Sequence, residues 1–290
     1  MQLIVFLIAY PLLWIISKLP FKLLYFVSDC VYVLVYKIIG YRKKVVRANI
    51  ALALPELSEK ERIETEKAFY HHLCDMFLEM IKTLSITGDE MAKRYEFTNI
   101  ELVHEYEKKG KSIILMCSHY ASWEWVIILG RFMNFKGFGI YKQLANPYFD
   151  KLVRDIRSKF DAGLIDTKHA ISAVRANVAK GQHGTYLFIS DQTPKLRNNN
   201  YWSSFMGVEV PIHVGGEKLA RELDLNVLYI KVMKVSRGHY KATFIPISDD
   251  VANEPQNAIT EKFLRVVEDQ IREEPKHYFW THKRFKHKKN

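Results

Sequence analysis

The stretch SIILMCSHYASWEW, residues 112–125, predicts the fold class. Residues 112–117 form a continuous apolar run, which is typical of a strand buried on both faces of a sheet. Similar apolar runs follow at 138–141, 185–189, 227–232 and 240–245. Helical patterns lie between most of them, at 123–133, 147–160, 171–179 and 216–223. This alternation predicts an α/β domain whose mostly parallel or mixed central sheet is flanked by helices.

The polar residues behind the first run form the candidate site. His119 follows that run by two residues, which places it at the carboxyl end of a strand, where ligands of α/β sheets bind. Glu124 comes five residues later, and about 500° of helical rotation would put the two side chains on different faces of one helix. They can meet if His119 lies in the turn before a helix and Glu124 in its first turn. A carboxylate on one imidazole nitrogen leaves the other nitrogen to act as a base.

The spacing of this pair is weak evidence by itself. With 11 histidines and 32 acidic residues in 290 positions, composition alone supplies about one such pair. A structural histidine paired with a carboxylate is therefore an equally open interpretation. Ser118 lacks the Gly-x-Ser-x-Gly elbow of a serine nucleophile, and Cys117 lies within the apolar run. If the pair is catalytic, we expect His119 to deprotonate a substrate hydroxyl.

The N-terminus carries two apolar stretches, residues 3–16 and 21–39, which are separated by a break that ends at Pro20. The first is shorter than the roughly 20 residues of a membrane span and lacks the features of a signal peptide. We expect residues 1–40 to form anchoring helices that enter or lie against a bilayer, although two buried core helices are an alternative. Residues 41–290 are then expected to form a single α/β domain. The basic cluster 41–47 favours a cytoplasmic location for that domain.

The net charge and the cysteine spacing limit the kinds of partner and of metal or disulfide site that we expect. A net charge of +11 favours a polyanionic partner, which by charge alone is nucleic acid, an anionic membrane surface or a phosphorylated substrate. The three cysteines are widely spaced and indicate neither a disulfide framework nor a zinc site.

A capping box at 58–61 begins a predicted helix over 58–84, which Gly88 is expected to end. The basic tail, residues 276–289, is predicted to be solvated and to contact acidic headgroups or an acidic carrier protein, not nucleic acid.

Five segments together resemble a known family. They are Arg42–Arg62, with Arg47-Ala48-Asn49-Ile50; His119–Glu124; Tyr141–Arg157; Asp191–Ala220, with Phe205-Met206-Gly207; and Trp280-Thr281-His282-Lys283-Arg284-Phe285-Lys286. In this order they resemble the lipid A biosynthesis (late) acyltransferases, within the wider lysophospholipid acyltransferase superfamily. The resemblance covers residues 19–286, and the second segment is similar to the family's His-x4-acid motif in its glutamate form.

The resemblance implies transfer of a fatty acyl chain from a thioester to a hydroxyl of a lipid A precursor, at the cytoplasmic face of the inner membrane. The donor would be acyl carrier protein or coenzyme A, with no cofactor and no metal. His119 would be the general base, and Glu124 would orient it. The other residues implied at the site are Arg157 and Asp191, then Arg154, Lys142 and Lys195 for phosphate or carrier contacts, and Phe205 and Met206 for the acyl path.

Three departures from the family pattern leave the acceptor and the chain length open. Lys142 stands where relatives commonly have arginine, which would lose a bidentate phosphate contact. Met206 and Phe285 replace a more usual phenylalanine and tryptophan. Two alternative functions therefore remain: an acyltransferase acting on a lysophospholipid or another glycolipid, and a non-catalytic membrane protein.

Overall fold

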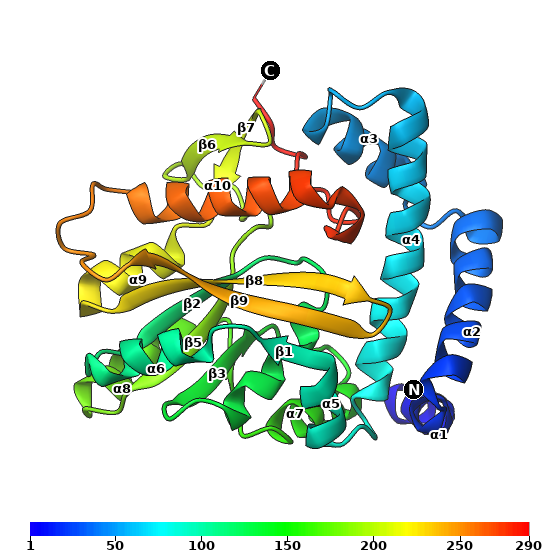
Figure 1. The fold of residues 1–290 in the computed structure, drawn as a ribbon, viewed down its shortest axis with the longest axis horizontal. Helices are drawn as coiled ribbons and strands as arrows, with labels where there is room; N and C mark the ends of the chain where they lie inside the picture. The colour runs from blue at the N-terminus through cyan, green and yellow to red at the C-terminus, as the bar shows by residue number, and fades with distance from the viewer. Residues whose placement is uncertain (290) are drawn as a thin grey trace.

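A seven-stranded sheet forms the centre of the protein, in a computed structural model that describes residues 1–289 (Figure 1). Its strand order is β1-β9-β8-β2-β5-β3-β4. The strands are β1 (Tyr95–Phe97), β2 (Ile113–Cys117), β3 (Lys136–Tyr141), β4 (Gly163–Asp166), β5 (Gly184–Ile189), β8 (Asn226–Ser236) and β9 (His239–Ser248). A separate hairpin pairs β6 (Tyr201–Phe205) with β7 (Val208–Ile212). The predicted domain boundary at residue 290 lies outside the described residues.

The strand directions confirm the predicted mixed, mostly parallel sheet. β2 runs parallel to both of its neighbours, β5 and β8, and β3 runs parallel to β4 and β5. Only the edge departs, because β9 is antiparallel to β8 and β1 follows the direction of β9. All five residues of β2 are buried, as expected for an apolar strand at the centre of a sheet covered on both faces.

Helices cover both faces of the sheet, and others pack beside it. The helices of the described residues are α1 (Gln2–Lys18), α2 (Phe21–Tyr32), η1 (Val33–Ile39), α3 (Lys43–Ala53), α4 (Glu59–Lys82), α5 (Gly88–Arg94), α6 (Ile100–Lys108), η2 (Trp123–Arg131), α7 (Pro147–Ser158), α8 (Ala170–Ala179), α9 (Gly215–Leu223), α10 (Ala258–Glu273) and η3 (Pro275–His277). In Figure 1, α10 lies on one side of β8 and β9 and α6 on the other, while α4 stands between the sheet and the N-terminal helices.

Most of the predicted elements are present, with shifted boundaries. The capping box of α4 is confirmed: the Ser58 backbone N–H donates to Glu61 Oε2 at 2.7 Å, and the Glu61 N–H donates to Ser58 Oγ. The predicted end of that helix was wrong, because α4 stops at Lys82 and Gly88 begins α5. The helix after His119 is a 3₁₀ helix, which the apolar pattern did not distinguish from an α-helix. The apolar pattern did not predict the short strands β1 and β4 or the β6–β7 hairpin.

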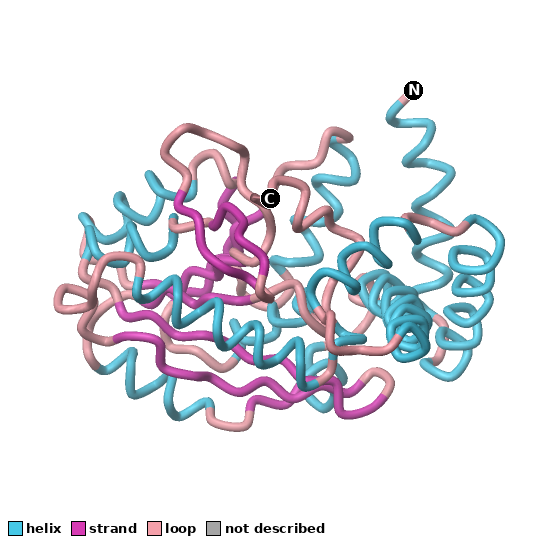
Figure 2. The backbone as a smooth tube through the Cα atoms, turned by 90° about the horizontal axis from the view of Figure 1, so that it is seen from above, coloured by secondary structure: helices cyan, strands magenta, loops and turns pink. Residues whose placement is uncertain are grey.

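The N-terminal helices present a large apolar surface to solvent. Ile8 on α1, Phe26 on α2 and Ile38 on η1 are each at least 65% exposed. Figure 2 shows α1 projecting from the rest of the fold. Within residues 1–289, no single helix combines the length and apolar character needed to cross a membrane; η1 with α2 reaches both only together with α3, across a 93° bend. An anchor over residues 1–40 therefore stays a prediction.

The C-terminal segment is packed into the protein. Trp280, Arg284 and Phe285 are buried, so the prediction of a solvated tail was wrong for this part of residues 276–289. The Asn49 side chain of α3 donates to the carbonyl oxygens of Trp280 at 2.8 Å and of His282 at 2.6 Å. Burial of the aromatic rings outweighs the preference of the neighbouring lysines for water, and those lysines stay exposed.

We expect Asn49→Ala to lower the free energy of unfolding by about 1–3 kcal/mol, because buried carbonyl oxygens lose a hydrogen-bond donor. Urea denaturation followed by circular dichroism would measure the change. Asn198→Ala, at an exposed position, is the matched control. Equal stabilities of the two variants would show that Asn49 does not hold the C-terminal segment.

Candidate active site

His119 lies in a sharp turn between β2 and η2. The turn requires a left-handed backbone at Ala121, where φ is +49°. The C-terminal segment holds it from outside: the Ala121 N–H donates to the His277 carbonyl at 2.9 Å, and the Phe279 N–H donates to the His119 carbonyl at 3.0 Å. His119 thus occupies the predicted position at the carboxyl end of β2, and two backbone hydrogen bonds to the C-terminal segment fix its turn.

Asp191 is the carboxylate that holds the imidazole. Its Oδ1 lies 2.7 Å from His119 Nδ1 and also accepts the His119 backbone N–H at 3.1 Å. Asp191 follows β5, and β5 lies beside β2, so the carboxyl ends of these parallel strands bring the two residues together. A carboxylate acceptor fixes the proton on Nδ1, which leaves Nε2 as the nitrogen that can accept a proton.

Asp191 is fully buried, while the His119 side chain is 20% exposed. Burial alone would raise the pKa of the Asp191 carboxyl, but the charge and hydrogen bonds of His119 outweigh it, so this pKa lies below its usual value. The carboxylate therefore stays ionised beneath the imidazole. The Trp123 ring packs edge-on against the imidazole of His119, with 5.2 Å between the ring centroids. The Phe279 ring stacks on it with 6.1 Å between the centroids. These two contacts restrict the orientation of the imidazole.

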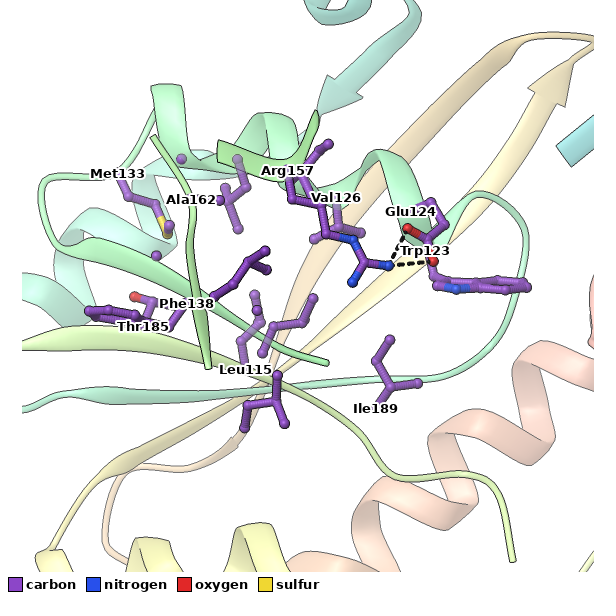
Figure 3. Close-up of a pocket in the computed structure, with 18 residues that line it drawn as sticks. Leu115, Trp123, Glu124, Val126, Met133, Phe138, Arg157, Ala162, Thr185 and Ile189 are labelled. Atoms are coloured by element: carbon purple, nitrogen blue, oxygen red, sulfur yellow. Dashed lines mark hydrogen bonds and ion pairs between the residues drawn. The ribbon is translucent and has the colours of Figure 1, made fainter. Parts of the chain in front are cut away.

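Glu124 has a different partner from the predicted one. Both of its carboxylate oxygens accept from Nη2 of Arg157, at 3.0 and 2.8 Å, as Figure 3 shows. The expectation that Glu124 orients His119 is therefore corrected, because the ring of His119 hydrogen-bonds to Asp191. Glu124 does lie in the first turn of the helix that follows the histidine, as predicted. From there it meets Arg157 in the last turn of α7.

An apolar cavity, here called the sheet pocket, opens beside this ion pair. It lies between η2 and the strands β3, β4 and β5, and its far end from Glu124 is formed by Met133, Phe138 and Thr185 (Figure 3). Gly137 and Gly139 of β3 both line it and point to one face of the strand. The missing side chains of these two glycines leave room for the cavity.

A second apolar cavity, the helix pocket, lies on the other side of the same ion pair. Helices α1, α4, η2 and α7 supply its walls: Leu13, Phe77, Met80, Ile81, Thr83, Leu84, Glu124, Ile127, Phe149, Leu152, Val153, Ile156 and Arg157. Three residues, Glu124, Ile127 and Arg157, line both pockets. The sequence pattern did not predict either pocket, although Gly139 within the predicted strand 138–141 was a usable signal for the first.

The remaining predicted site residues line neither of these two pockets. Lys142 and Lys195 are exposed in the loops after β3 and β5, at the same sheet edge as His119. Arg154 is paired with Asp150 at 3.1 Å. Phe205 and Met206 are buried at the end of the β6–β7 hairpin and line neither pocket, so their place on the acyl path stays a prediction.

Residues 2–287 match the sequence model of the bacterial lipid A biosynthesis acyltransferases. The chain belongs to this family. It is an acyltransferase, and the resemblance drawn from its five segments is confirmed.

Its curated relatives are named for different acyl chains. The chain is 23% identical to an Escherichia coli lipid A biosynthesis lauroyltransferase, over 94% of its own length and 89% of the relative's. It is 21% identical to the E. coli lipid A biosynthesis myristoyltransferase (83% and 74%) and 18% identical to the palmitoleoyltransferase (94% and 88%). These names differ in chain length, so they do not fix the chain that this enzyme transfers.

We expect Asp191→Asn to lower kcat about 100- to 10,000-fold, because an amide can donate to Nδ1 and so place the ring proton on Nε2, where the base is needed. Steady-state kinetics would measure the loss. Asp155→Asn, on the exposed face of α7, is the control and should retain activity.

The same variant has a stability signature. The folded-state pKa of Asp191 is depressed, so its ionised form stabilises the fold above the ordinary aspartate value of about 4 and loses this contribution as the pH falls through the folded value. The wild type should therefore lose more stability than Asp191→Asn on acidification below about pH 4. Parallel acid-denaturation curves would contradict this reading of the pair.

Proposed function

We propose that this enzyme transfers a fatty acyl chain from an acyl thioester, carried by acyl carrier protein, to a hydroxyl of a lipid A precursor, with His119 as the general base. The observation that carries the proposal is the imidazole held at Nδ1 by buried Asp191, beside an ion pair that borders two apolar pockets.

The reaction proceeds in one direct transfer. Nε2 of His119 removes the proton from the acceptor hydroxyl as its oxygen attacks the thioester carbonyl, and a tetrahedral oxyanion forms. The carbon–sulfur bond then breaks, and the imidazolium gives the proton to the departing thiolate. Asp191 stabilises the charged ring between these steps. Arg157 supplies positive charge near the oxyanion, and Glu124 acts as the residue that positions its guanidinium.

Neither neighbouring nucleophile competes with the substrate hydroxyl. Cys117 is buried in β2, and burial raises the pKa of its thiol far above the usual value. Ser118 is buried as well, and its hydroxyl is hydrogen-bonded to the Tyr229 hydroxyl at 2.9 Å. These restraints support direct transfer without an acyl-enzyme.

The sheet pocket fits the acyl chain of the donor. A carrier protein delivers its chain through water, so the whole hydrocarbon must be enclosed once it leaves the carrier, and this pocket lies inside the α/β fold. Lys142 and Lys195, exposed at the edge of the sheet that carries His119, are placed to contact the acidic carrier or the phosphates of the acceptor.

The exposed apolar helices fit the surface of the inner membrane, with the α/β domain on the cytoplasmic side. Side chains such as Ile8 and Phe26 would enter the bilayer, and the basic cluster 41–47 would meet anionic headgroups.

The double substitution Ile8→Ser with Phe26→Ser should weaken binding to anionic vesicles by about tenfold or more, because two large apolar side chains no longer enter the membrane. Co-sedimentation with the vesicles would measure the partitioning. Ile171→Ser on α8, which Figure 1 places at the opposite end of the molecule, is the control. Equal partitioning of all three proteins would remove the membrane role of these helices.

His119→Ala should lower acyl transfer about 100- to 10,000-fold while the protein stays folded, because the base is lost and the backbone N–H of residue 119 still donates to Asp191. The assay uses purified enzyme, acyl carrier protein thioesters and a panel of lipid A precursors and lysophospholipids, with circular dichroism for the fold. Full activity in folded His119→Ala would exclude the mechanism, and transfer to lysophospholipids alone would exclude the proposed acceptor.

A further inference from the structure

We infer that the helix pocket binds a hydrocarbon chain of the acceptor lipid, separately from the donor chain. This inference rests on the proposed acyl transfer. A direct transfer brings two lipids to one base, so two hydrocarbon chains must be accommodated at the same time. Two apolar pockets among the described residues meet at Glu124, Ile127 and Arg157, and Glu124 lies in the first turn of η2, five residues after the base.

The lining of the helix pocket suits a hydrocarbon. Apart from the ion pair, its walls are aliphatic, aromatic or methionine side chains and Thr83. The Thr83 hydroxyl is already engaged with the Glu79 carbonyl at 3.1 Å and with the Trp125 indole at 3.2 Å. A chain entering this pocket therefore leaves few polar groups without partners, and each methylene that it buries there favours binding.

The position of the pocket selects the acceptor over the donor. Leu13 of α1 forms one of its walls, and the neighbouring Leu12 and Ile15 are more than half exposed. Phe6 packs against Tyr148 and Phe149 of α7, which docks α1 beside the pocket. A lipid that stays anchored in a membrane can therefore pass a chain along α1 into the pocket without crossing water. The sheet pocket has no wall from α1.

The occupied pocket would also orient the acceptor. With its chain fixed between α4 and α7, the polar end of the lipid lies next to Arg157 and faces the site. Holding the hydroxyl near Nε2 in this way turns a collision between two lipids into a reaction between bound groups.

The test fills each pocket in turn. Val153 lines only the helix pocket, and Gly139 lines only the sheet pocket. A Cβ at Gly139 would lie 3.4 Å from the Leu164 side chain, so a larger residue there fills the cavity without striking the backbone. Lys151→Trp, at an exposed position on α7, is the matched control for Val153→Trp.

With Val153→Trp, the KM for a long-chain lipid A precursor should rise about tenfold or more, since excluding about two methylene groups corresponds to this loss. Its KM for a short-chain, water-soluble analogue and its preference among donor chain lengths should not change. Gly139→Val should do the reverse and shift the preference toward shorter donor chains. Lys151→Trp should match the wild type in every assay. If Val153→Trp does not fold, Leu152→Trp fills the same pocket.

The outcomes separate this inference from the proposed function. A change in donor preference with Val153→Trp would overturn the assignment of the pocket to the acceptor, and unchanged kinetics with both acceptors would show that no chain binds there. Equal loss with the long and short acceptors would mean a structural effect and would also overturn it. If the wild type transfers no acyl group to any lipid A precursor, the proposed function itself fails.

Discussion

The hydrogen bond between His119 and Asp191 joins the carboxyl ends of two adjacent parallel strands, β2 and β5. This hydrogen bond depends on the strand order. Because β2 and β5 are adjacent and parallel, the loops that follow them begin side by side at the same edge of the sheet. A histidine in the turn after one strand and a buried carboxylate after the next are then brought into contact by the backbone alone. The rest of the site is arranged around this bond: η2 carries Glu124 away from the ring, and α7 brings Arg157 to meet it.

The C-terminal segment keeps that arrangement in place. It pairs with the backbone of the His119 turn, its Phe279 ring stacks on the imidazole, and its carbonyl oxygens accept from Asn49. It also holds the loop after β5, because the Thr193 hydroxyl donates to the Arg284 carbonyl at 2.6 Å. Segments from the beginning, middle and end of the chain thus support one histidine. These segments all lie within residues 2–287, which match the family's sequence model.

The sequence predicted those features that depend on local pattern. Apolar runs with helical patterns between them indicated an α/β sheet, and the position of His119 after the first run indicated the edge where it lies. The partner of His119 was predicted wrongly because sequence proximity favoured Glu124, whereas the strand order, a non-local property, brings Asp191 to the ring. The tail was misjudged for a related reason. Its lysines Lys283 and Lys286 are exposed, but its aromatic residues are buried against segments that are distant in sequence, as Phe285 is against Phe205.

The Glu124–Arg157 ion pair is a wall common to both pockets, and a common wall couples the two sites energetically. A chain that displaces the guanidinium from one side changes the space and the charge on the other side. Any such effect is reciprocal: if a bound donor changes the affinity for the acceptor by some factor, a bound acceptor changes the affinity for the donor by the same factor. If the two pockets hold the donor and acceptor chains as proposed, displacement of this one ion pair is the route by which the occupancy of either pocket would reach the other.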